Sequence, residues 1–185
     1  IFFRVMTSFT PANTPLIRPK KSIQFDYEAE LVIVIGKRAK HLTLDNAADY
    51  VAGYTCGMEG SIREYQRHTT QWGMGKNFDQ SGSYGPWMVT ADELPRGGKG
   101  LKIETRLNGT TMQSSNTDLF MFPVAESLVY LTEGITLEPG DVVLTGTPAG
   151  VGAPKQTFLS VGDRVDAEIE GIGKLSVTIQ EPLIG

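Results

Sequence analysis

Two glutamates stand two residues apart in the segment Asp26-Tyr27-Glu28-Ala29-Glu30. Side chains two positions apart on a strand point to the same side, so Glu28 and Glu30 would project their carboxylates together. Two like charges held that close repel each other unless a cation lies between them. Carboxylate oxygens are hard ligands that suit Mg²⁺, Mn²⁺ or Ca²⁺ better than zinc. The segment therefore predicts a divalent-metal site, and a solvated strand face is the alternative.

A third acid, Glu59, opens the polar segment 59–66. If the chain is helical beyond Gly60, then Glu59, Arg63 and Gln66 fall at positions i, i+4 and i+7 and share one helical face. A carboxylate, a guanidinium and an amide would then converge. The alternative is a surface helix with an internal Glu59 to Arg63 ion pair, which contributes little to stability.

Two glycine-rich segments could add further groups to such a site. Residues 71–79 form a loop that presents one lysine, Lys76, and a solvated lysine is the alternative interpretation. Residues 144–152 end a strand in a turn with three glycines and two hydroxyls. Such a turn can bring backbone N–H groups close to a carboxylate. A tight β connection without a ligand is the alternative.

The segments that must position these residues are predicted to be mainly β-strands. The apolar run 31–35 predicts a buried strand, and Asn108-Gly109 predicts a type I′ hairpin turn because both positions need positive φ. Helices are expected over 45–51 and over 123–133, the second with proline at its start and Gly134 just past its end. Further strands are expected from Gly53 onward and over 86–90, 103–107, 142–145, 164–169 and 174–179. Strands outnumber helices and alternate with them irregularly, which predicts an α+β fold with a large mixed sheet.

Composition excludes several classes of protein. The 185 residues, 40% of them hydrophobic, can bury one substantial core, so we expect a single domain over 1–185. The net charge of -4 and the lack of a basic tract argue against nucleic acid as a partner. No apolar run approaches the roughly 18 residues that span a bilayer, so we expect no membrane association. The single cysteine, Cys56, fits a reducing compartment, and we expect a cytoplasmic protein.

Seven blocks of the chain, taken in order, resemble the fumarylacetoacetate hydrolase family over nearly the whole length. Any one block is weak, but seven with matching order and spacing make coincidence improbable. The blocks are Asp26 to Leu31, Gly53 to Thr55 leading into Glu59 and Arg63 to Gln66, Gly75 to Asp79, Gly85 to Trp87, Leu107 to Gly109, Gln113 with Ser115 to Thr117, and Pro139 to Gly152.

The resemblance implies a β-rich sandwich or roll of mixed sheets, usually assembled as a homodimer. It also implies an acidic triad that holds Mg²⁺ or Mn²⁺, and by position Glu28, Glu30 and Glu59 are that triad. Most members have Asp at the position of Glu59, usually preceded by Asn where this chain has Met58. The extra methylene should move the carboxylate by about 1 Å, which makes the tight octahedral geometry of Mg²⁺ harder to reach and leaves Mn²⁺ and Ca²⁺ open.

The resemblance assigns the substrate groups as well. Arg63 and Gln66 match the family's substrate-contacting pair, Lys76 matches its active-site lysine, and these three residues are the expected catalytic groups. Thr147, with Gly146 beside it, matches the hydroxyl next to the substrate carboxylate. The expected substrate is therefore a small 2-oxo acid.

Several reactions are compatible with the resemblance. The first expectation is hydrolysis of a C–C bond in an acylpyruvate or fumarylacetoacetate-like acid through an enolate. The alternatives are a decarboxylase or an isomerase or hydratase of oxaloacetate-like or hydroxymuconate-type acids, or a catalytically silent member that acts as a binding protein.

The family places a His and Glu dyad on a segment upstream of the region that matches Ile1. The chain opens without an initiator methionine, and we expect that an N-terminal segment belongs to the whole protein. His41 and His68 do not stand at the dyad's position, so neither is assigned its role.

Overall fold

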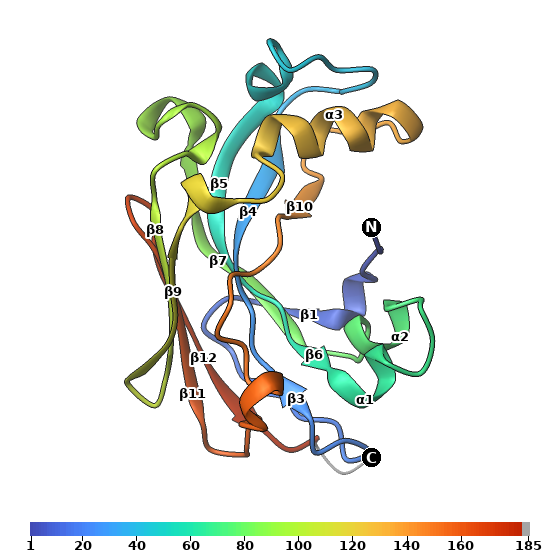
Figure 1. Ribbon diagram of the computed structural model, residues 1–185, viewed down its shortest axis with the longest axis vertical. Coiled ribbons are helices and arrows are strands. Elements are labelled where there is room, and N and C mark those ends of the chain that lie inside the picture. Colours follow the sequence, from blue (N-terminus) through green and yellow to red (C-terminus); the bar gives the residue numbers. More distant parts are fainter. Residues whose placement is uncertain (183–185) are drawn as a thin grey trace.

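The computed structural model describes residues 1–182, which form two five-stranded sheets packed face to face and a two-stranded ribbon at one end (Figure 1). The first sheet has the order β1 (Phe9–Thr10), β7 (Gly82–Thr90), β5 (Val51–Met58), β4 (Ala29–Ile35) and β10 (Val142–Leu144). The second has the order β2 (Leu16–Ile17), β12 (Gly173–Gln180), β11 (Arg164–Ile169), β8 (Lys102–Leu107) and β9 (Thr110–Asn116). The ribbon pairs β3 (Phe25–Asp26) with β6 (Ser61–Ile62). The sheets are mixed, because β1 is parallel to β7 and β2 is parallel to β12 while the other pairs are antiparallel.

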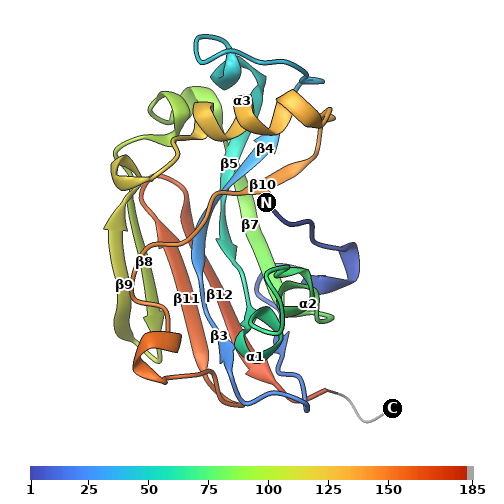
Figure 2. The same ribbon diagram turned by 45° about the vertical axis from the view of Figure 1, so that its right-hand side comes forward.

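Helices are few and lie at the ends of the sandwich. The longest, α3 (Val124–Gly134), crosses one end, and the single turns α1 (Arg63–Gln66) and α2 (Gly73–Lys76) lie beside the first sheet near the other end (Figure 2). Short 3₁₀ turns connect the elements at Met6–Ser8, Ala47–Tyr50, Ala91–Glu93, Arg96–Gly98, Thr117–Leu119 and Ala153–Lys155. Within residues 1–182 no helix is long and apolar enough to cross a membrane.

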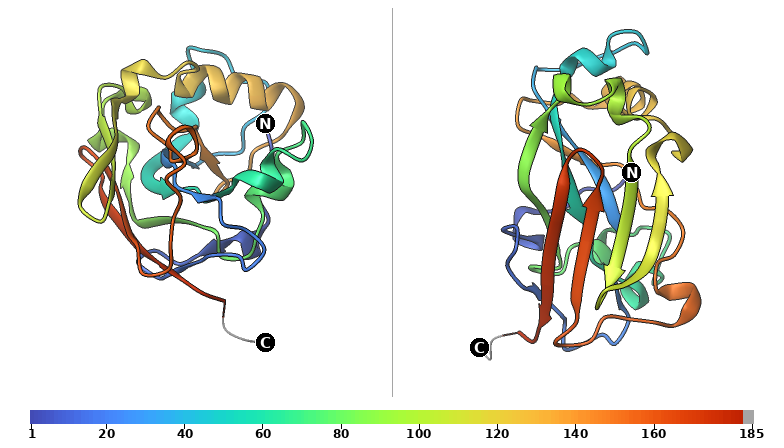
Figure 3. Two further views of the ribbon diagram at one scale, coloured as in Figure 1. Left: turned by 60° about the horizontal axis from the view of Figure 1, so that its bottom comes forward. Right: turned by 90° about the vertical axis from the view of Figure 1, so that its left-hand side faces the viewer.

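One hydrophobic core joins the two sheets. The second sheet alternates in the way a half-buried sheet requires: Val165, Ala167 and Ile169 of β11 face the core, and the residues between them face solvent. Strand β4 is different, because it is buried on both faces from Ala29 to Ile33. The right-hand view of Figure 3 shows the second sheet face-on, with the first sheet behind it.

Most of the predicted elements are confirmed. The run 31–35 lies within β4, and the hairpin between β8 and β9 turns at Asn108 (φ 50°) and Gly109 (φ 82°), as the type I′ turn requires. The prediction of a helix over 45–51 is wrong beyond a single 3₁₀ turn. The reason is tertiary, since Val51 already pairs with Ile35 and begins β5.

Strand pairing fixes where the acidic residues meet. Ala29 pairs with Met58 across β4 and β5, and just before this pair the N–H of Glu59 donates to the carbonyl of Glu28 at 2.9 Å. Glu59, which follows β5, is thereby held beside Glu28, which precedes β4, and Glu30, which lies at its start.

Candidate metal centre

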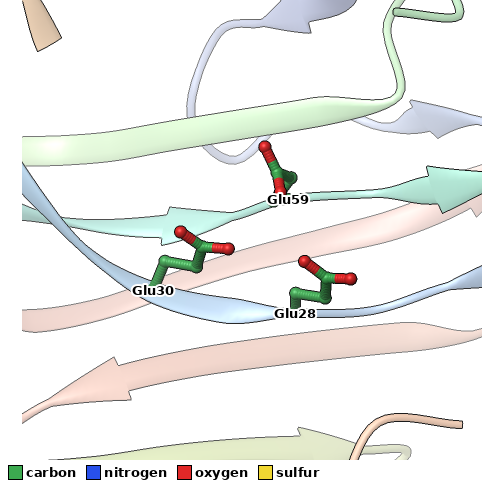
Figure 4. Close-up of side chains that lie close together, drawn as sticks. All are labelled: Glu28, Glu30 and Glu59. Atoms are coloured by element: carbon green, nitrogen blue, oxygen red, sulfur yellow. The ribbon is translucent and has the colours of Figure 1, made fainter. Parts of the chain in front are cut away.

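Glu28, Glu30 and Glu59 converge in one buried cluster. One carboxylate oxygen from each lies within 4.8 Å of the others, and the three residues are 5%, 2% and 3% exposed. Figure 4 shows Glu28 and Glu30 on the segment that leads into and begins β4, with their carboxylates turned toward Glu59, which follows β5. The alternative of a solvated strand face is therefore wrong for this segment.

Lys76, at the end of α2, reaches into the same cluster. Its Nζ lies 2.8 Å from Glu28 Oε2 and 2.6 Å from Glu59 Oε2, and the residue is buried. The alternative of a solvated loop lysine is contradicted by these contacts. The Phe2 ring covers the ammonium at 5.2 Å from the ring centroid and adds a cation–π contact.

The prediction that Glu59 shares a helical face with Arg63 and Gln66 is wrong. A β-bridge at Ser61–Ile62 pairs with the chain at Phe25–Asp26, and the helical turn begins only at Arg63. Arg63 and Gln66 do share that turn, and Arg63 Nη1 donates to Gln66 Oε1 at 2.8 Å.

Arg63 is a buried link between two carboxylates. Its Nη1 lies 2.7 Å from Glu28 Oε1, and its Nε donates to Asp26 Oδ2 at 2.8 Å. Glu28 also accepts a hydrogen bond from Ser61 Oγ at 2.8 Å. In this arrangement the guanidinium orients Glu28, and the substrate-binding roles expected for Arg63 and Gln66 stay predictions.

Asp26, the first residue of the acidic segment 26–30, connects the loop after β10 to the helical turn α1. The carboxylate is fully buried and accepts the backbone N–H groups of Gly152 at 2.7 Å and Ala153 at 2.9 Å, besides Arg63. It thereby ties the end of the loop 146–153 to the helical turn at Arg63.

The loop after β10 touches the centre through Gly146 and Thr147. The N–H of Gly146 donates to Glu30 Oε2 at 2.7 Å, so this turn presents a backbone donor to a carboxylate of the protein itself. The hydroxyl of Thr147 donates to the carbonyl of Ala29 at 2.8 Å. The expected contact of Thr147 and Gly146 with a substrate carboxylate stays a prediction.

Arg4 is a residue of the centre that no sequence signal indicated. It is held by Ser8 and by Ser81 Oγ at 2.9 Å, and its Nη1 lies 3.6 Å from Glu59 Oε1. Burial lowers the pKa of Arg4, and the nearby Glu59 opposes that shift. The carboxylate of Glu59 thus meets a positive charge at each oxygen, with Arg4 at Oε1 and Lys76 at Oε2.

The three glutamates differ in the direction of their pKa shifts. Burial raises the pKa of Glu30, and the charges of Glu59 and Glu28 raise it further. Burial also raises the pKa of Glu59, against the opposing effect of Lys76. Burial alone would raise the pKa of Glu28, but Lys76 and Arg63 hold it below its usual value. Burial would lower the pKa of Lys76, yet Glu28 and Glu59 raise it, so this lysine is a cation.

The residues fit a divalent cation. Three carboxylates with hard oxygen ligands are gathered within 4.8 Å, a spread that one ion can bridge when each oxygen lies about 2.1 to 2.5 Å from it. Positive charge between the acids would also relieve the repulsion that raises the pKa of Glu30. In the described residues neither histidine joins this cluster, since His68 packs against Tyr65 and His41 lies on an exposed turn.

Comparison with known proteins identifies the family. Residues 1–180 match the model described as "Fumarylacetoacetate (FAA) hydrolase C-terminal". The chain belongs to the fumarylacetoacetate hydrolase family. The match confirms the resemblance. The α+β fold predicted from the pattern of strands and helices is confirmed by the structure.

Relatives of this family member are longer than the chain. The "Fumarylacetoacetate hydrolase domain-containing protein 2 homolog" of Dictyostelium discoideum is 38% identical over 187 residues, covering 95% of this chain and 61% of the relative. "Oxaloacetate tautomerase Fahd2a, mitochondrial" of Rattus norvegicus is 39% identical over 176 residues, covering 94% of this chain and 56% of the relative. The chain thus spans 61% and 56% of the lengths of these two proteins.

Solved structures of the family share the fold. The fumarylacetoacetate hydrolase of Exiguobacterium antarcticum superposes with a TM-score of 0.90 at 37% identity, covering 95% of this chain and 64% of that one. The 2-hydroxyhepta-2,4-diene-1,7-dioate isomerase of Mycobacterium marinum gives 0.87 at 34%, covering 95% and 66%. The fumarylpyruvate hydrolase of Pseudomonas aeruginosa, solved with Mn²⁺ and pyruvate, gives 0.82 at 32%, covering 98% and 75%.

Proposed function

We propose that this chain forms the catalytic core of a divalent-metal-dependent enzyme that cleaves a C–C bond in a small 2-oxo acid of the acylpyruvate type. The observation that carries the proposal is the buried cluster of Glu28, Glu30 and Glu59 with Lys76 in direct contact. The Mn²⁺ and pyruvate bound to the Pseudomonas aeruginosa relative support both the class of cofactor and the class of ligand.

Mg²⁺ or Mn²⁺, held by the three glutamates, would supply a Lewis acid for the negative charge that develops when a 2-oxo acid enolises. The chain's own residues prepare the site for that charge. Lys76 keeps its proton and its positive charge in a buried place, where charge interacts more strongly than in water. Arg63 fixes the orientation of Glu28, and the Gly146 N–H fixes that of Glu30.

A second reaction class has a specific observation in its favour. The rat relative is named an oxaloacetate tautomerase. Tautomerisation and isomerisation move a proton and need no hydrolytic water. We therefore carry a tautomerase or isomerase of oxaloacetate-like or hydroxymuconate-type acids as the alternative.

A substrate panel separates these reactions. The protein with Mn²⁺ would be offered an acylpyruvate, the enol form of oxaloacetate and a hydroxymuconate-type acid, and products would be followed by NMR. Release of pyruvate from the acylpyruvate supports the hydrolase, and ketonisation of enol-oxaloacetate without fragmentation supports the tautomerase. A protein that binds Mn²⁺ but converts none of the three would contradict both and support a binding role.

Assembly as a homodimer and location in the cytoplasm are also proposals. Membership of the family motivates the dimer, and the segment 117–134 offers exposed apolar side chains for an interface: Leu119, Met121, Phe122 and Tyr130. Sedimentation should give a dimer at micromolar protein, and a monomer would contradict this. Fractionation of cells tests the location, for which the name of the rat relative offers mitochondria as the contrasting outcome.

A further inference from the structure

Ala29 lies between two proposed metal ligands and is held by side chains on both of its backbone polar groups. Its N–H donates to Gln113 Oε1 at 3.1 Å, and its carbonyl accepts from Thr147 Oγ1 at 2.8 Å. The two peptide units of Ala29 lead directly into Glu28 and Glu30. A shift of either unit would therefore move one carboxylate relative to the other.

The two side chains that hold Ala29 also bond to each other. Gln113 Nε2 donates to Thr147 Oγ1 at 2.9 Å, which closes a ring through Ala29, Gln113 and Thr147. The ring joins β9 of the second sheet, the start of β4 and the loop after β10. These segments are far apart in the sequence, since Ala29 and Gln113 are 84 positions apart.

The Gln113 amide is fully used and its orientation is fixed. Besides the ring, Oε1 accepts from Thr105 Oγ1 at 2.6 Å and Nε2 donates to the Pro148 carbonyl at 2.7 Å, while the residue is 1% exposed. Because the N–H of Ala29 can only donate and the Pro148 carbonyl can only accept, a flipped amide would lose both bonds. Gln113 therefore sets the spacing between the ligand strand and the loop.

That loop reaches the centre one residue away. Gly146, the neighbour of Thr147, donates its N–H to Glu30 Oε2 at 2.7 Å. The backbone of Glu30 is thus held through Ala29 in its own strand, and its carboxylate is held by the N–H of Gly146 in the loop. The hydrogen bond between Gln113 and Thr147 links these two supports.

We propose that Gln113 is a positioning residue of the metal centre, which acts through Thr147 and Ala29 to hold Glu28 and Glu30 in the geometry that binds a divalent cation. This inference rests on the proposed metal site. Partners that orient metal ligands in this way typically change metal affinity by about 10- to 100-fold when they are removed.

The test measures Mn²⁺ affinity without substrate, from the electron paramagnetic resonance signal of free Mn²⁺. Gln113→Met keeps the length of the side chain and removes its hydrogen bonds, and Thr147→Val keeps the shape of Thr147 and removes its hydroxyl. Each should weaken Mn²⁺ binding by about tenfold or more. The double variant should lose less than the product of the two single effects, because both changes break the same ring.

Thr132→Val is the matched control. Thr132 is fully buried in α3, and its hydroxyl also joins two backbone groups, the N–H of Leu42 at 3.1 Å and the carbonyl of Leu128 at 2.8 Å. This variant should lose stability as Thr147→Val does and should keep the Mn²⁺ affinity and the spectrum of bound Mn²⁺ of the unmutated protein. A general loss of stability is thereby separated from a change at the centre.

The outcomes are distinct. If the unmutated protein binds no Mn²⁺, the proposed metal site fails. If it binds Mn²⁺ and folded Gln113→Met and Thr147→Val bind equally well, or if their effects multiply in the double variant, the positioning role of Gln113 is wrong. Should Gln113→Met not fold, Thr147→Val alone decides, since it leaves the packing of the ring unchanged.

Discussion

Lys76 bridges Glu28 and Glu59 in the acidic centre, and Arg106 bridges Glu104 and Glu168 on the outer face of the second sheet. The contacts have similar lengths and the same residue classes. The surroundings differ, because the side chains of Lys76 and Glu59 are each 3% exposed while those of Arg106 and Glu168 are 30% and 45% exposed.

Burial gives the same arrangement two different consequences. On the outer face water screens the charges, and such a bridge contributes little. In the centre each charge has lost its water, so an unpaired one is costly, and the cluster holds a third acid, Glu30, that Lys76 does not contact. Because the buried acids Asp26, Glu28, Glu30 and Glu59 outnumber the buried cationic side chains of Arg4, Arg63 and Lys76, the centre is our proposed cation site, whereas the outer network is a solvated surface.

Lys76→Met should have the largest effect on stability. Without the ammonium, Glu28 and Glu59 lose a buried partner, and breaking a buried ion pair typically costs about 3 to 5 kcal/mol of unfolding free energy. Urea unfolding in EDTA at neutral pH would measure the loss. Added Mn²⁺ should recover most of it, and a variant as stable as the unmutated protein would contradict the account of the centre.

The stabilisation by metal should grow with pH. Burial, with Glu59 and Glu28 adding to it, raises the pKa of Glu30, and a carboxyl with a raised folded-state pKa contributes stability that is lost as the pH rises through that pKa. A bound cation needs the carboxylate and removes this loss, so binding releases protons. The difference in unfolding free energy between Mn²⁺-loaded and EDTA-treated protein should widen between about pH 5 and about pH 8, by up to about 1.4 kcal/mol per pH unit for each proton released. A constant difference across this range would contradict the pKa direction assigned to Glu30.

Arg106→Met should have the smallest effect and is the counterpart of Lys76→Met. The exposed bridge to Glu104 and Glu168 should contribute less than about 1 kcal/mol, and even this should shrink in high salt. Urea unfolding at low and high salt would measure it. A loss as large as that of Lys76→Met would show that burial does not separate the two networks.

Local pattern predicted much of the fold and the acids of the site. The apolar run 31–35, the Asn108-Gly109 turn and the spacing of Glu28 and Glu30 each follow from neighbouring residues, and the structure bears them out. Glu59 and Lys76 stand out in polar or glycine-rich segments, their roles follow only from the family resemblance, and the structure places both in the cluster.

The features of the site that the sequence did not predict depend on contacts between segments that are distant in the chain. Arg4 reaches Ser81 across 77 positions, and Asp26 accepts the N–H of Gly152 across 126. No periodicity signals such pairs, so their roles emerge only from the folded chain. The helical face expected for Glu59 failed for a similar reason, because pairing with the segment at Phe25 extends the chain where the local pattern favours a helix.

The central claim is that Glu28, Glu30 and Glu59 together bind a divalent cation, and thermal unfolding of the unmutated protein and of Glu30→Gln tests it most directly. A ligand that binds only the folded state adds RT ln(1 + [L]/Kd), so millimolar Mn²⁺ should raise the melting temperature of the unmutated protein and EDTA should lower it. Glu30→Gln nearly keeps the shape of Glu30 and removes its charge, so the Mn²⁺ shift should vanish while the metal-free variant is at least as stable as the unmutated protein. Equal melting temperatures with and without metal in the unmutated protein, or undiminished Mn²⁺ binding in Glu30→Gln, would contradict the claim.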